Sequence, residues 1–181
     1  RMGGVIDNTD KDYLDTPVLM HVKARLPWLL VLMVSYVFTG GMIASFEKSL
    51  SAVIALVAYM PMLMGTGGNS GTQSSTVIIT GMATGDLELS DVLRVLWKEF
   101  RIGIIVGICV SILNYMRIVA FDHNGSLVAL TVCLSMVLIV IIAKCIGALL
   151  PMIAKKIGID PALIAGPMMA SLTDMVALGT Y

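Results

Sequence analysis

Charged residues are scarce in this chain. Asp, Glu, Lys and Arg make up 13% of its 181 residues, against about 25% in an ordinary soluble domain. Hydrophobic residues, in contrast, make up 57% of the chain. This composition excludes a water-soluble globular domain and predicts an integral membrane protein of the all-α class.

Cysteine is also rare, and no surplus of one charge exists. Cys109, Cys133 and Cys145 lie in apolar stretches without CxxC spacing, which argues against a thiolate metal site or a disulfide framework. The chain has 12 basic and 12 acidic residues, and no basic surface interleaved with aromatics. We therefore expect no nucleic-acid partner.

The stretch GTGGNSGT lacks the lysine of a phosphate-binding loop, which argues against nucleotide binding.

Long apolar runs are what the sequence has in abundance. A bilayer crossing needs about 20 apolar helical residues. The runs predict five transmembrane helices, at about 26–46, 50–84, 102–121, 126–150 and 161–181. Residues 1–25 are polar, and Lys and Arg concentrate there and in the loops that follow the second and fourth helices. By the positive-inside rule, the N-terminus is cytoplasmic and the C-terminus is extracytoplasmic.

The second of these runs is too long for one straight crossing. It contains Pro61, which removes a backbone donor, followed by Gly65, Gly67 and Gly68. We expect the second helix to be broken or kinked at Pro61–Gly68. Irregular backbone at membrane depth is tolerated where protein buries it or where it lines a water-filled cavity, so the break favours a hydrophilic pathway.

Polar residues after the expected break fall on one helical face. Asn69, Thr72, Gln73 and Thr76 are spaced i, i+3, i+4 and i+7, and Thr80 continues the series. Such a face either lines a pore or bonds to neighbouring helices. The second interpretation is supported by small-xxx-small spacing nearby, as between Gly67 and Gly71.

Asp174 is the one acidic residue that the sequence places well inside a crossing. Its neighbours on one helical face are Gly166, Ala170, Thr173 and Ala177, small enough to admit water or an ion. A carboxylate at this depth needs a cation, a partner or water to compensate it. We favour a pathway over the alternative, a buried aspartate bonded to a hydroxyl such as that of Thr72 or Thr76.

Lys144 is a second ionisable residue within an apolar run. It precedes Pro151 by two turns, so we expect its stem to reach the interface by snorkelling rather than to serve a function inside the membrane. Gly103 and Gly107 are expected to form a helix-packing pair in the third crossing.

The polar pattern suits a hard divalent cation. If two chains pair about a twofold axis, two Asp174 carboxylates face each other. Magnesium keeps several of its waters and is bound by one or two carboxylates, whereas softer metals prefer sulfur and imidazole. Mg²⁺ is therefore the ion we expect.

Two motifs carry a family resemblance: PMLMGTGGNSGTQ followed by GMATGDL, and DPALIAGPMMASLTD near the end. They resemble the membrane domain of the MgtE magnesium channels, and the resemblance covers the whole chain. It implies a homodimer in the lipid bilayer, with five transmembrane helices per subunit and a pore lined by the second and fifth. It also implies that residues 1–25 end a connecting helix, and that the cytoplasmic N-terminal and CBS domains of full-length relatives are absent here.

The same resemblance implies roles for individual residues. Asp174 would hold hydrated Mg²⁺, with backbone carbonyls offered by Ala170 and Gly166. The pore-facing residues of the second helix would be Gly65, Gly68, Asn69, Thr72 and Thr76.

The expected function is passive conduction of Mg²⁺ through the plasma membrane into the cytoplasm. The alternative is a secondary transporter that exchanges Mg²⁺ against Na⁺ or H⁺, because broken helices are also a transporter device. An enzyme that uses Asp174 as acid or base is not expected, since the crossings supply no second acidic or histidine partner. A purely structural subunit would leave Asp174 and the polar face without a role.

Overall fold

The computed structural model describes residues 17–51, 54–122, 126–161 and 167–180, and all regular structure in these ranges is helical. The predicted all-α class is therefore confirmed. In chain order the elements are α1 (Val18–Ser51), α2 (Ile54–Val57), α3 (Met60–Thr84), the 3-10 turn η3 (Leu89–Asp91), α4 (Val92–Arg117), the π-helical turn η4 (Ile118–Asp122), α5 (Ser126–Lys156) and α7 (Pro167–Thr180).

Three segments of the described chain are long and apolar enough to cross a membrane: Val18–Gly41, Leu89–Asp122 and Ser126–Lys156. The second and fifth predicted crossings correspond to α3, which carries the polar face, and to α7, which has 14 residues. The count of five crossings stays a prediction. Helix ends also differ from expectation: α4 begins at Val92 rather than near 102, and α5 continues past Pro151 to Lys156.

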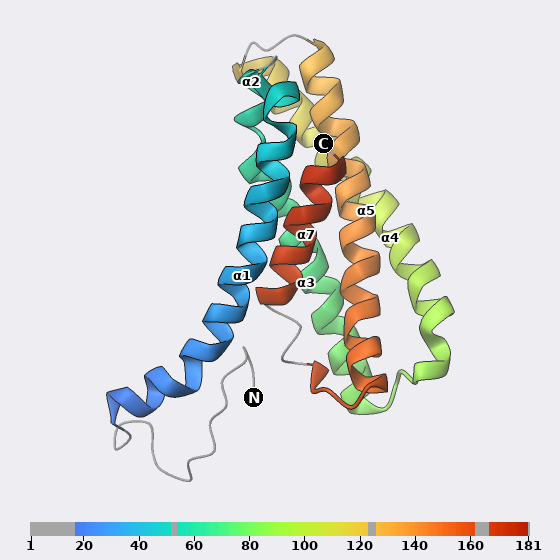
Figure 1. The fold of residues 1–181 in the computed structure, drawn as a ribbon. Coiled ribbons are helices and arrows are strands. Elements are labelled where there is room, and N and C mark those ends of the chain that lie inside the picture. Colours follow the sequence, from blue (N-terminus) through green and yellow to red (C-terminus); the bar gives the residue numbers. More distant parts are fainter. Residues whose placement is uncertain (1–16, 52–53, 123–125, 162–166, 181) are drawn as a thin grey trace.

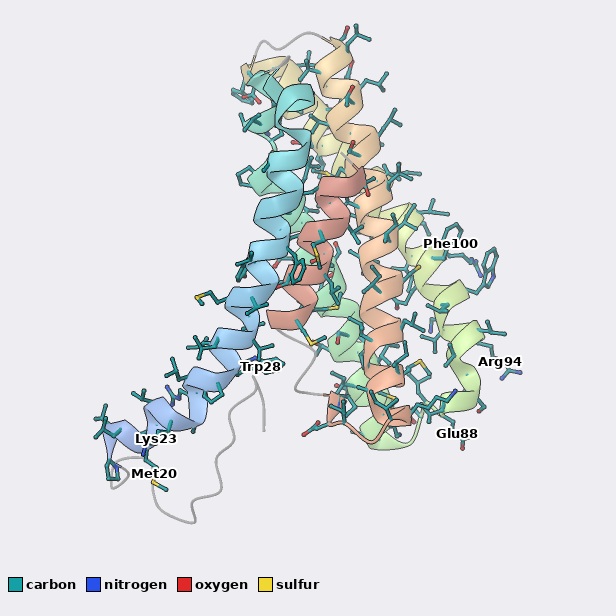
Figure 2. All side chains as sticks on the ribbon, in the orientation of Figure 1. Met20, Lys23, Trp28, Glu88, Arg94 and Phe100 are labelled. Atoms are coloured by element: carbon teal, nitrogen blue, oxygen red, sulfur yellow. The ribbon has the colours of Figure 1, made fainter. Side chains whose placement is uncertain are left out.

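Helix α5 lies at the centre of the bundle, where it contacts α3, α4 and α7 (Figure 1). Helix α1 contacts α7 and α2, and its first turns lead away from the bundle. Figure 2 shows Met20, Lys23 and Trp28 along this part of α1. Large apolar side chains of α1, such as Leu29 and Phe38, are exposed, as expected of a helix that contacts lipid.

Glycines set the distances between helices. A Cβ atom added to Gly147 of α5 would collide with the carbonyl oxygen of Gly71 on α3. In the α4–α5 contact, a Cβ on Gly103 would lie 2.9 Å from Cα of Ile141. A Cβ on Gly107 would lie 3.2 Å from Cα of Val137, so the predicted packing role of Gly103 and Gly107 is confirmed.

The predicted break at Pro61–Gly68 is not found, because α3 is a continuous helix from Met60 to Thr84, and a kink there stays a prediction. The interruption lies earlier, at Ala58 and Tyr59. Pro61 stands in the first turn of α3, where its missing N–H has no helical partner to lose. The glycines that follow do not break the helix because Gly67 and Gly71 are used for close packing against α5 and α7.

Polar contacts fix the start of α3 to the end of α4. The Tyr59 hydroxyl donates a hydrogen bond to the Asp122 carboxylate at 2.8 Å, and Arg117 pairs with the same carboxylate at 3.4 Å. The guanidinium also lies 5.8 Å from the centre of the Tyr59 ring. Helix α3 therefore begins at a defined place in the bundle.

We predict that Gly147→Ala destabilises the protein by about 1–3 kcal/mol, because the added methyl group forces α3 and α5 apart. Thermal unfolding in detergent measures the change. The matched control is Gly40→Ala on α1, where a Cβ meets nothing within 4 Å. Equal stability of the Gly147→Ala variant and the parent would contradict the packing described above.

Candidate functional site

The polar face of α3 carries a series of threonines spaced four residues apart. The hydroxyl of Thr72 donates to the Gly68 carbonyl at 2.8 Å, that of Thr76 to the Thr72 carbonyl at 2.9 Å, and that of Thr80 to the Thr76 carbonyl at 2.9 Å. A hydroxyl has one proton and two lone pairs, and here the proton is held by the helix backbone. The threonines therefore offer only acceptor lone pairs to whatever lies beside them.

This face is open in the single chain. Asn69, Gln73, Thr76 and Thr80 are exposed, and Thr72 is half-buried. An open cavity of about 890 Å³ borders the face, with Asn69, Thr72, Gln73 and Thr76 in its wall. The structure thus brings together the four residues that the sequence places on one helical face.

The cavity wall also contains two buried charges. Glu99 of α4 is 7% exposed and Lys144 of α5 is 5% exposed. Ser74 of α3 joins them: its hydroxyl donates to Oε2 of Glu99 at 2.6 Å and accepts from Nζ of Lys144 at 3.4 Å. The Ser74 hydroxyl of α3 therefore bridges an acidic side chain of α4 and a basic side chain of α5.

The interpretation of Lys144 as a snorkelling residue is wrong. Its ammonium group points into the bundle because Ser74 and Glu99 provide a hydrogen bond and an opposite charge there.

Sequence reasoning did not predict that Glu99 is buried. Glu99 lies one turn before Gly103, on the face that continues to Gly107 and begins with the buried Val95. That four-residue spacing was the available signal for its burial.

Asp174 lies on α7, away from this cavity, and is half-buried. The neighbouring Thr173 is fully buried, close to Gly67 and Gly68 of α3, and its hydroxyl donates to carbonyls of its own helix. The hydroxyls of Thr72 and Thr76 likewise donate to their own helix. In the part of the chain that the structure describes, the alternative of an Asp174 bonded to either threonine is not observed.

The other predicted site residues have varied surroundings. Gly65 is exposed, Gly68 and Ala170 are half-buried, and Ala177 belongs to the apolar core. Gly166 lies outside the described residues. Among the residues described, no three His, Cys, Asp or Glu side chains are grouped closely enough to hold a metal ion. The proposed roles of these positions stay predictions.

The fold and the apolar helices define a multi-pass helical membrane protein. Its residues 60–181 match the family model of MgtE, described as a divalent cation transporter. The chain belongs to the MgtE family, and the resemblance seen in its motifs is confirmed.

Three relatives carry the name magnesium transporter MgtE. The protein of Thermus thermophilus is 39% identical over 178 residues, which is 98% of this chain and 39% of the relative. The Bacillus subtilis protein is 33% identical over 188 residues, covering 98% of this chain and 42% of the relative. The Enterococcus faecalis protein is 29% identical over 163 residues, covering 90% of this chain and 36% of the relative. The chain thus spans about two fifths of the length of these relatives.

We predict that Ser74→Ala lowers the free energy of unfolding by about 1–3 kcal/mol, because Glu99 and Lys144 lose the hydroxyl that joins them. The matched control is Ser75→Ala. The Ser75 hydroxyl is buried and has no hydrogen-bond partner in the described structure, so its removal should be neutral or stabilising. Chemical denaturation of both variants in the same detergent compares them, and equal effects would count against the bridge.

Proposed function

We propose that this chain forms the membrane pore of a magnesium channel that conducts Mg²⁺ passively into the cytoplasm. The observation that carries the proposal is the threonine series on α3, whose hydroxyl protons are all committed to the helix backbone. A row of acceptor groups attracts the protons of water bound to a cation and repels anions. Membership of a family described as divalent cation transporters supports the same ion class.

Hydrated magnesium matches the chemistry of this face. Mg²⁺ releases its waters reluctantly and is usually bound through several of them. Hydroxyl and amide oxygens of Thr72, Thr76, Asn69 and Gln73 can accept hydrogen bonds from such waters without displacing them. The cavity of about 890 Å³ beside this face leaves room for a hydrated ion, and Asp174, which does not line it, is proposed to hold the ion at a separate point of the path.

The chain is proposed to act as a homodimer, with the pore on the twofold axis between the α3 and α7 helices of two subunits. Asp174 then supplies one carboxylate from each subunit, and two carboxylates compensate one divalent charge. The carbonyls of Gly166 and Ala170 are proposed to lie beside the ion.

The N-terminus is proposed to lie in the cytoplasm and the C-terminus outside the plasma membrane. A membrane potential that is negative inside then drives Mg²⁺ into the cytoplasm. At 100 mV a divalent ion gains about 4.6 kcal/mol, from about 2.3 per charge. No coupled ion is then required.

We predict that Asp174→Asn lowers Mg²⁺ uptake by tenfold or more, because the ion loses its only proposed carboxylate partners in the pore. Uptake is measured in proteoliposomes whose interior is held negative by a potassium diffusion potential. Uptake by the parent that requires Na⁺ or H⁺ to move in the opposite direction would support the exchanger instead. Uptake equal in variant and parent would remove Asp174 from the mechanism.

We predict that Thr76→Val lowers Mg²⁺ uptake severalfold, because an apolar methyl group replaces a hydroxyl acceptor of nearly the same volume. The control is Thr131→Val on α5. The Thr131 hydroxyl is exposed and donates to the Leu127 carbonyl at 2.9 Å, the same local geometry away from the α3 face. Equal losses in both variants would mean that the threonine bonds serve the helices rather than the ion.

A further inference from the structure

Glu99 and Lys144 on the cavity wall are bridged by a hydroxyl group. The Lys144 ammonium and the Glu99 carboxylate make no direct contact in the described structure, and each reaches the other through the hydroxyl of Ser74. Both side chains nevertheless line the same cavity as the polar face of α3. Each charge therefore acts both on its partner and on anything that enters the cavity.

The balance of these charges decides the potential that an ion meets. In a partly buried site, unit charges several ångströms apart interact far more strongly than in bulk water. Lys98 is a third charged residue of the wall and is exposed at the surface. Without Glu99 the wall would carry only positive charges, Lys98 and Lys144, beside a path lined by acceptor groups.

We propose that Glu99 is a positioning and charge-balancing residue that neutralises Lys144 and so keeps the α3 cavity accessible to divalent cations. Lys144, in turn, limits the attraction of the cavity for cations, so that an ion can enter and also leave. This inference rests on the proposed conduction of Mg²⁺ along α3.

Opposite effects of the two charges distinguish this role from a structural one. Glu99→Gln removes the negative charge but keeps an oxygen that can accept from Ser74. Lys144→Met removes the positive charge but keeps an unbranched apolar stem. If the pair only holds helices together, both variants lose function in the same direction. If it sets the cavity potential, the two variants shift cation access in opposite directions.

The first measurement is Mg²⁺ uptake at subsaturating concentration in proteoliposomes. We expect Glu99→Gln to lower uptake about tenfold, Lys144→Met to raise it, and the double variant to return within about twofold of the parent, because interaction energy scales with the charges present. Uptake lowered in both single variants and not restored in the double variant would overturn the proposal.

The second measurement does not depend on conduction. A cysteine is placed at Thr76, an exposed residue of the cavity, in a chain that also carries Cys109→Ser, Cys133→Ser and Cys145→Ser. Its rates of reaction with a cationic and an anionic methanethiosulfonate reagent are compared. We expect the cation-to-anion rate ratio to fall about tenfold with Glu99→Gln and to rise with Lys144→Met, since the two reagents respond in opposite senses.

The two measurements separate the failure of this inference from that of the proposed function. Absence of uptake in every protein, with the reaction-rate ratio shifting in opposite directions, would count against conduction but support the charge balance. Uptake by the parent with an unchanged ratio, or with a ratio that shifts the same way in both variants, would overturn the charge balance and leave conduction intact.

Discussion

The close contact between α3 and α5 at Gly71 and Gly147 is the constraint on which the rest of the structure depends. Because the backbones approach so closely there, the small residues of α3 must face α5, and the opposite side of the helix must face outward. That outward side bears Asn69, Gln73 and Thr76. One packing contact between glycines therefore fixes which groups α3 offers to an ion.

The position of the buried polar residues follows from the same orientation of α3, with its small residues facing α5. With Gly71 against α5, Ser74 lies one turn further along the inner side, between Glu99 and Lys144. A buried ion pair contributes little to stability by itself, since desolvation of both charges offsets their attraction. Its place on the wall of the α3 cavity is the basis of the electrostatic role proposed for it. The inner face of α3 thus contributes Ser74, which bridges the buried pair, and the outer face contributes the polar residues Asn69, Gln73 and Thr76 to the same cavity.

The sequence was sufficient for features that depend on local spacing. The all-helical class, the polar face at Asn69 to Thr76 and the packing of Gly103 and Gly107 all follow from helical periodicity, and long motifs indicated the family. It was insufficient where the outcome depends on another helix. Pro61 and the glycines after it were compatible with a break or with a tightly packed helix, and only α5 and α7 decide between these. Lys144 could reach the interface or the interior, and the position of Glu99 decided that.

A cysteine-accessibility scan of α3 from Asn69 to Thr80 tests most directly whether its polar face borders an aqueous path. The scan uses a membrane-impermeant thiol reagent on the protein in lipid vesicles. High reactivity is expected at positions 69, 72, 73, 76 and 80, which share the polar face, and protection at positions 70, 74, 75 and 78, which are buried. Addition of Mg²⁺ should slow the reaction on the polar face. Uniform reactivity along the helix, or reactivity greatest at the buried positions, would contradict the claim that this face borders an aqueous path.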